Sequence, residues 1–425
     1  MRVAILALLM ALSDAAIAED EFLSLKGHGG PIMALAVEAN GTGRLASASF
    51  DNAAALWDQG TPAWLERHDA AVTALAFAEN GDLFTAGDDF TIWHWGAAKP
   101  VELGRHKGKI RALSVSPDGR TVAAASWDGT VGLWSLMGEA PQMLTLGAGV
   151  NDVAFDATGT VFAATMDGRI LRIEGDMPRV LVEQGFGINR LVVQDGWLAY
   201  GAVDGATRII DAETGAQLAD FTLDRRPILA LAHHKETAQL AVGDGQGYIM
   251  VVDTRNWRIA RDFRAMREGP VWALAFDQPG ARLWAGGLDA VIYGWPVALL
   301  GEFDPVGDSR AFLIAPDTVG NGERQFLRKC SICHALRDDG TRKAGPHLAG
   351  IFGRPAGSLK DYRYSETLDQ AAIIWNDESI DALFDLGPDH YIPGSKMPMQ
   401  RITGAEDRAD LIAFLKQATG GEEEK

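Results

Sequence analysis

A pattern that recurs seven times fills the N-terminal two thirds of the chain and restricts the possible fold more than any other feature. Within residues 22–297 each copy runs through an apolar strand, a turn, a second strand, a turn that usually contains Asp, and a third strand. A bulky apolar residue follows six positions after the turn residue, and successive copies lie 38, 39, 39, 37, 42 and 43 residues apart. The pairs are Asp51 and Trp57, Asp89 and Trp95, Asp128 and Trp134, Asp167 and Ile173, Asp204 and Ile210, Gln246 and Val252, and Asp289 and Trp295. This spacing is typical of propeller blades and predicts an all-β propeller of seven blades.

The repeats resemble the WD-repeat family. The residues that carry the likeness are Gly27-His28, Arg67-His68, Arg105-His106, Ser116-Pro117-Asp118-Gly119 and Leu56-Trp57-Asp58. In that family a His, a Ser or Thr, the turn Asp and the Trp form a buried hydrogen-bonded set inside a blade. The resemblance therefore implies three such sets, at His28, Asp51 and Trp57, at His68, Asp89 and Trp95, and at His106, Ser126, Asp128 and Trp134. A metal-binding role for these histidines is the alternative, but repetition at one structural position favours the scaffold.

The segment before the first repeat is expected to close the ring. Residues 22–25 occupy the place of the outer strand that precedes each repeat, so we expect them to complete the seventh blade and cover its edge.

The first eighteen residues resemble a secretory signal, with a basic Arg2, an apolar run over residues 3–12, and small residues that end at Ala18. The competing interpretation is a membrane anchor, which needs about 20 apolar residues. We therefore expect export, with the periplasm as the location. The expected division is a signal peptide at 1–18, the propeller at 19–300, a linker at 301–316, a second domain at 317–421 and an acidic tail at 422–425.

The charge balance argues against nucleic acid as a partner. The chain has 39 Lys and Arg against 57 Asp and Glu, a formal net charge of -18, which repels phosphate backbones. No later segment resembles a membrane span.

The strongest chemical signal is Cys330-Ser331-Ile332-Cys333-His334, which contains both cysteines of the chain. Two thiols at this spacing can form thioethers to the two vinyl groups of one haem, and the adjacent His can then reach the iron. A thioredoxin-like dithiol would need a βαβ setting, and a zinc site would need a second Cys pair. The pattern predicts covalent attachment of one haem c through Cys330 and Cys333.

Residues 320–420 resemble the class I c-type cytochromes, which are all-α proteins. The matching motifs are Gly322 and Phe326, Gly345-Pro346, Leu348, Gly350, Gly353-Arg354, Tyr362 to Tyr364, Trp375, Tyr391 to Met397, and Arg408 to Leu415. The resemblance implies that His334 and Met397 are the axial ligands of the iron and that the Pro346 carbonyl orients His334. It also places Arg354, Tyr364 and Trp375 at the haem propionates, and Ser395 near the propionate and the Met. For Tyr364 and Trp375, plain core packing is the alternative.

An iron with two axial protein ligands has no open position, so the sequence favours an electron carrier over a catalyst. The propeller is then expected to be a docking platform for a redox partner protein. Two alternatives stay open: a fused redox enzyme with a second cofactor in the propeller, and a redox-sensing or assembly scaffold. Five basic residues are expected around the haem edge, either to steer an acidic partner or simply as solvated surface: Arg328, Lys329, Arg342, Lys343 and Lys396.

Overall fold

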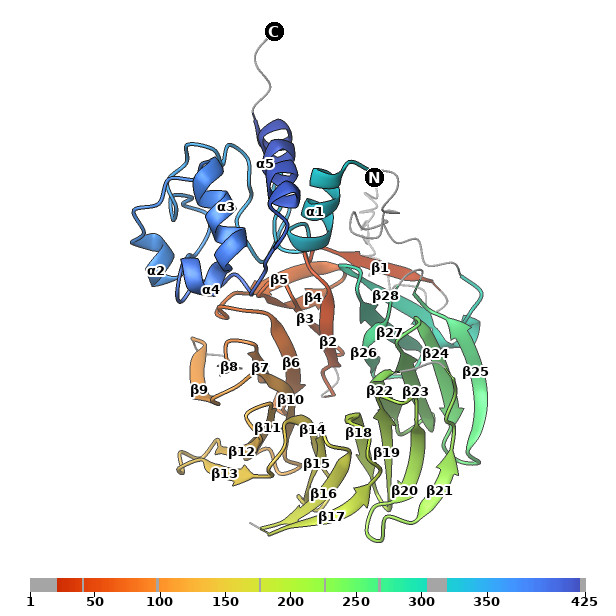
Figure 1. Cartoon of the computed structure of the whole chain (residues 1–425). Helices are drawn as coiled ribbons and strands as arrows, with labels where there is room; N and C mark the ends of the chain where they lie inside the picture. Colours follow the sequence, from red (N-terminus) through yellow and green to blue (C-terminus); the bar gives the residue numbers. More distant parts are fainter. Residues whose placement is uncertain are drawn as a thin grey trace, which may run out of the picture.

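The computed structural model describes residues 21–39, 42–96, 99–175, 177–224, 227–266, 269–303 and 319–420 (Figure 1). The expected signal peptide, most of the expected linker and the acidic tail lie outside the described residues. Among the described helices, none is long and apolar enough to cross a membrane.

Seven four-stranded antiparallel sheets form the N-terminal domain and confirm the predicted number of blades. Blades 1 to 3 comprise β2 (Ile32–Val37), β3 (Leu45–Ser49), β4 (Ala54–Asp58) and β5 (Thr61–Leu65); β6 (Val72–Phe77), β7 (Leu83–Gly87), β8 (Thr91–Trp95) and β9 (Val101–Arg105); and β10 (Ile110–Val115), β11 (Thr121–Ser126), β12 (Thr130–Ser135) and β13 (Gln142–Thr145). Blades 4 and 5 comprise β14 (Val150–Phe155), β15 (Val161–Thr165), β16 (Arg169–Glu174) and β17 (Met177–Glu183); and β18 (Ile188–Gln194), β19 (Trp197–Ala202), β20 (Thr207–Asp211) and β21 (Gln217–Asp220). Blades 6 and 7 comprise β22 (Ile228–His234), β23 (Gln239–Asp244), β24 (Tyr248–Asp253) and β25 (Arg258–Arg264); and β26 (Val271–Phe276), β27 (Arg282–Gly287), β28 (Val291–Pro296) and β1 (Leu23–Lys26).

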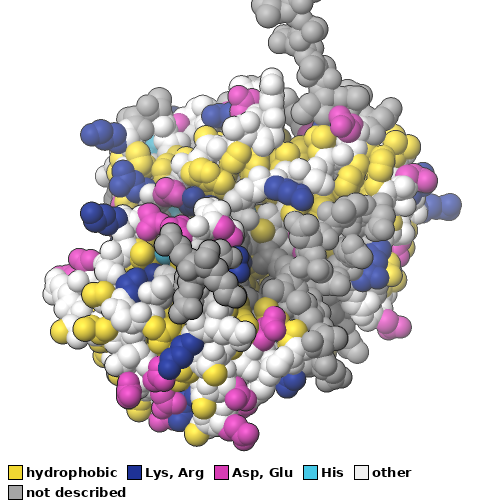
Figure 2. Space-filling model, turned by 90° about the horizontal axis from the view of Figure 1, so that it is seen from above, with side chains coloured by type: hydrophobic (Ala, Val, Ile, Leu, Met, Phe, Trp, Pro, Cys, Tyr) yellow, Lys and Arg dark blue, Asp and Glu magenta, His cyan; other side chains and the backbone are white. Residues whose placement is uncertain are grey.

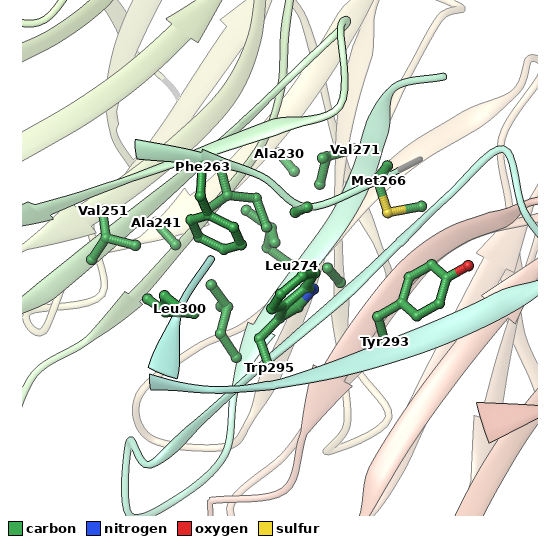
Figure 3. Close-up of a cluster of buried hydrophobic side chains, with 14 of the residues drawn as sticks. Ala230, Ala241, Val251, Phe263, Met266, Val271, Leu274, Tyr293, Trp295 and Leu300 are labelled. Atoms are coloured by element: carbon green, nitrogen blue, oxygen red, sulfur yellow. The ribbon is translucent and has the colours of Figure 1, made fainter. Parts of the chain in front are cut away.

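The N-terminal strand closes the ring as expected. β1 pairs antiparallel with β28, with Leu23 opposite Gly294 and Lys26 opposite Val291, so the last blade takes its outer strand from the start of the chain. Phe22 packs edge-on against Trp295, with ring centroids 4.8 Å apart. Trp295 lies in an apolar cluster between blades 6 and 7, together with Phe263 and Leu274 (Figure 3). The two ends of the propeller are therefore joined by a strand pairing and by a shared core.

The first strand of every blade carries a β-bulge after its first residue, as between Val150 and Asp152 of β14. The bulge residue of several blades reaches the next blade. The Asn151 amide donates to the Ile188 carbonyl at 3.0 Å, and the Asn189 amide donates to the Ile228 carbonyl at 2.8 Å. These bonds fix neighbouring blades to one another near the ring axis.

The predicted polar set is present in blade 1. His28 Nδ1 donates to Asp51 at 2.9 Å, the Ser47 hydroxyl donates to His28 Nε2 at 2.7 Å, and Trp57 Nε1 donates to Ser47 at 2.7 Å. Blade 2 repeats the arrangement, with Thr85 in the place of Ser47.

The prediction that Ser126 belongs to the polar set of blade 3, with His106, Asp128 and Trp134, was wrong. The residue four positions before the turn Asp128, where blade 1 has Ser47, is Ala124. Ser126 instead accepts from the backbone N–H of Asp128 at 3.1 Å. His106 Nδ1 keeps its bond to Asp128 at 3.1 Å, but its buried Nε2 makes no hydrogen bond to any described residue.

The C-terminal domain is helical and lies over the propeller beside blade 1 (Figure 1). A short 3-10 helix, η1 (Val297–Leu299), follows the last blade. The helices are α1 (Asn321–Lys329), α2 (Glu366–Asp369), α3 (Asp377–Leu386), α4 (Pro388–Tyr391) and α5 (Ala405–Thr419).

Helices α1 and α5 cross at Gly322, where a Cβ would collide with the carbonyl oxygen of Asp410. Phe326 and Phe414 pack beside the crossing, with ring centroids 5.7 Å apart. Thr403 and Glu406 have the spacing of a capping box, which predicts that Thr403 caps α5, but the residue that precedes the helix is Gly404 and no side chain caps it. Gly420 ends the helix.

Candidate haem site

Both cysteines lie in a turn that continues directly from α1. The backbone N–H of Cys330 donates to the Phe326 carbonyl at 2.8 Å, and that of His334 donates to the Cys330 carbonyl at 2.9 Å. The turn places both sulfurs and the imidazole on one cavity. Burial raises the pKa of the Cys330 thiol to about 12 and that of Cys333 to about 11. A dithiol redox catalyst needs a lowered thiol pKa, so this environment disfavours the thioredoxin-like alternative.

His334 is held in one tautomer by the loop that follows it. Its Nδ1 donates to the Pro346 carbonyl at 2.7 Å, which leaves the lone pair of Nε2 free to bind a metal. Gly345 makes this approach possible, because a Cβ at this position would lie 2.8 Å from Nδ1 of the ring. Burial lowers the pKa of His334, although the bond to Pro346 acts in the opposite direction. The imidazole is therefore kept neutral, which is the form that binds iron.

Met397 reaches the same cavity from the loop that follows α4. It follows a turn in which Gly394 has a φ of +84°, and its backbone N–H donates to the Ser395 hydroxyl at 3.1 Å. Met397 packs with the core of the domain and lines the cavity with Ser395.

The cavity has a volume of about 410 Å³ and largely apolar walls. The apolar lining residues of the helical domain are Leu348, Ile351, Leu368, Trp375, Ile380, Leu383, Phe384, Ile392 and Leu415. An imidazole nitrogen, a thioether sulfur and two thiols inside such walls are the donor set that a covalently bound haem requires. The residues present therefore fit the group.

The residues expected at the propionates also line this cavity. Arg354 donates to the carbonyls of Ala349 at 2.8 Å and His347 at 2.9 Å, and burial lowers the pKa of its guanidinium. Tyr364 and Trp375 lie in the same wall. Tyr362, for which the motifs predict no specific role, also lines the cavity. Its hydroxyl donates to the Ala344 carbonyl at 2.8 Å.

Two features of the α3–α4 region follow from the sequence. Leu383 and Phe384 are buried and line the cavity, so this part of the wall is apolar. Gly387, which has a φ of +92°, joins α3 to α4 directly before Pro388.

The propeller contributes a wall of the cavity that sequence reasoning did not foresee. Phe50, Asn52, Ala70 and Ala71 of blades 1 and 2 line it, together with the Lys109–Asp88 ion pair at 2.6 Å. No local motif marks these residues, since they meet the cavity only through the placement of one domain on the other.

Residues 319–419 match the family model described as Cytochrome c. Cytochrome c of Chlamydomonas reinhardtii is 41% identical over 101 residues, which make up 24% of this chain and 89% of that protein. The chain belongs to the cytochrome c family. Members of this family carry haem c, and electron transfer is the function that the domain supports. Cytochrome c of Gibberella zeae is 39% identical over 106 residues and is covered over 99% of its length.

A cytochrome c homolog of Rickettsia felis is 43% identical over 104 residues, and the chain spans 58% of its length. These similarities cover about a quarter of the present chain, all of it in the cytochrome domain. The family model described as WD domain, G-beta repeat matches residues 20–58, 62–96 and 100–135, which contain the three inner strands of blades 1 to 3 and the strand before each of them. A short match to Strictosidine synthase-like, N-terminal covers residues 142–173 of the propeller. The protein therefore fuses a WD-repeat propeller to a cytochrome c domain.

Proposed function

We propose that the protein is an exported carrier of single electrons with one haem, bound covalently through Cys330 and Cys333 and ligated by His334 and Met397. One observation carries the proposal. Both thiols, a neutral imidazole with a free Nε2 and a thioether line the same apolar cavity. When bound, haem c supplies a reversible one-electron couple, and a thioether ligand favours its ferrous form.

Each of the residues around the cavity has a distinct task in this proposal. Pro346 fixes the tautomer of His334, and the apolar wall excludes water from the cavity. Arg354, Tyr364, Trp375 and Ser395 are the proposed contacts of the propionate side. The periplasm is the proposed location because of the signal-like segment at 1–18, and the propeller is the proposed docking platform.

Haem stoichiometry and attachment test this function. The mature protein, made with a working cytochrome c maturation system, is expected to contain one haem per chain that stays with the polypeptide after acid-acetone extraction. Potentiometric titration of its visible spectrum should follow a single one-electron curve. Two haems, an additional chromophore or extractable haem would contradict the proposal, and an additional chromophore would favour the fused enzyme.

A further inference from the structure

Three cations beside the haem cavity, Arg342, Arg363 and Lys396, form the basic rim of the cytochrome domain, and all three pair with acidic residues of the propeller. Lys396, which directly precedes Met397, donates to Asp69 of blade 2 at 2.7 Å and to the Arg363 carbonyl at 3.0 Å. Arg363 forms an ion pair with the same Asp69 and donates to the His68 carbonyl at 3.0 Å. One propeller carboxylate therefore holds two cations of the cytochrome domain.

A second contact is centred on Arg342. Its guanidinium pairs with Glu66, lies 3.5 Å from Asp51 and stacks over Trp64 at 4.4 Å from the ring centroid. The charge of Arg342 is one of the influences that hold the pKa of Asp51 below its ordinary value, in spite of burial. The contact thus reaches the buried polar set of blade 1.

Two positions of blade 1, Gly29 and Asn52, lie against the backbone of the cytochrome domain. Gly29 occupies the position that holds Asp69 in blade 2 and Lys107 in blade 3, and a Cβ at Gly29 would collide with the Arg342 carbonyl. Asn52, with a φ of +68°, stands where blade 3 has Gly129, and its amide donates to the Ala344 carbonyl at 3.1 Å. Blades 2 and 3 carry larger side chains at this position and blades 4 and 5 have Gly147 and Gly185, but in blade 1 a larger side chain would meet the cytochrome domain.

We propose that the propeller surface formed by Gly29, Asp51, Glu66 and Asp69 is a docking surface for the chain's own haem domain. This propeller surface competes with external acidic redox proteins for the basic rim of the haem domain. The proposal rests on the haem function proposed above. With the domains docked, Arg342, Arg363 and Lys396 are already paired, and propeller residues line the cavity. An external protein gains access to this edge only when the two domains separate.

In the part of this face that Figure 2 draws in colour, viewed from the helical end, basic and acidic side chains are interspersed among apolar ones. Asp69 and Arg363 are 54% and 57% exposed, so salt screens their attraction. Rising ionic strength is therefore expected to release the docked domain.

The test measures oxidation of the ferrous protein by cupric plastocyanin, an acidic copper protein, with stopped-flow absorbance. One electron passes from Fe(II) to Cu(II) in each event. Asp69→Lys removes two ion pairs, and Lys already stands at this repeat position in blade 3. Gly29→Asp inserts the residue that blade 2 has at this position and pushes against the Arg342 backbone. If the rate follows the undocked fraction, each variant should react on the order of tenfold faster than the wild type at low salt.

The two variants change the charge in opposite directions, which separates docking from simple steering. Steering alone would accelerate Asp69→Lys and slow Gly29→Asp, and that outcome would overturn the proposal. Asp195→Lys is the matched control, since Asp195 is exposed and pairs with Lys235 within the propeller, and its rate should stay close to that of the wild type. The wild-type rate should rise with moderate salt, and a steady fall would also overturn the proposal. An unchanged visible spectrum in all variants shows that the haem site is intact, so failure of docking is distinguishable from failure of the haem function.

Discussion

The polar set that is complete in blade 1 and incomplete in blade 3 predicts a stabilising substitution. In blade 1 the Ser47 hydroxyl accepts from Trp57 Nε1 and donates to His28 Nε2, both at 2.7 Å. Blade 3 has the corresponding His106, but its Nε2 makes no hydrogen bond to any residue within the described ranges. Ala124→Ser places a hydroxyl at the corresponding position, so we expect the variant to be more stable than the wild type.

The expected magnitude follows from the number of groups that the hydroxyl satisfies. A net hydrogen bond contributes about 1 kcal/mol, so Ala124→Ser should raise the free energy of unfolding by about 1–2 kcal/mol. The reverse change, Ser47→Ala, leaves two buried polar groups without a partner and should lower it by about 2–3 kcal/mol.

Urea unfolding of the propeller, followed by circular dichroism, measures both effects. With an m value of about 3 kcal/mol/M, Ala124→Ser should raise the midpoint by about 0.3–0.7 M. Ala123→Ser is the control, because Ala123 is fully buried in an apolar cluster on the opposite face of the strand, and a hydroxyl there should destabilise. If Ala124→Ser were no more stable than the wild type while Ser47→Ala lost stability, the equivalence of the two positions would be refuted.

Three further outcomes are expected. Deletion of residues 19–26 removes the strand that closes the ring and should lower the thermal midpoint of the propeller by several degrees, and an unchanged midpoint in a thermal scan would refute the closure. Gly345→Ala should displace the His334 ring and reduce the yield of protein with the low-spin haem spectrum, and a normal yield and spectrum would speak against this packing. The bonds from His28 and other donors lower the folded pKa of Asp51 despite burial, so its stabilisation is present above pH about 4 and is lost as the pH falls through the folded pKa. Asp51→Asn should therefore flatten the decline of the urea midpoint below pH about 4, and an unaltered decline would contradict the assignment.

The blade count and the closure of the ring were predictable because both depend on local repetition. A turn residue and an apolar residue six positions apart mark each third strand, and their spacing fixes the number of blades without any knowledge of packing. The four residues of the proposed haem attachment and ligation were recognisable for a similar reason, since Cys330, Cys333 and His334 are adjacent and Met397 lies in a specific motif. The structure brings them to one cavity.

Side-chain partners within a blade were less predictable. Ser126 and Ala124 both face the same side of β11, because successive side chains of a strand alternate. Two positions along a strand correspond to about 7 Å, which is too far for one hydroxyl to replace the other at His106. Composition alone does not show which of the two positions must carry the hydroxyl. The start of α5 was misassigned for a related reason, since Thr403 and Gly404 both precede the helix and only the backbone geometry decides between them.

The contact between the domains could not be derived from the sequence, because it depends on three-dimensional placement. Arg342 and Asp51 are 291 positions apart along the chain, and no motif links them. Gly29 lacks the side chain that blades 2 and 3 carry at the same position, but blades 4 and 5 also have glycine there, so the repeat pattern alone does not mark it. The glycine gains meaning only once the Arg342 backbone is seen beside it.

The ferric absorption band that arises from the bond between thioether sulfur and iron tests the central claim most directly. The wild type and Met399→Leu should both show this band, because Met399 is 48% exposed and is not the proposed ligand. Met397→Leu should lack the band while keeping its haem bound covalently to Cys330 and Cys333. A band that persists in Met397→Leu, or mature protein that is colourless, would contradict the account.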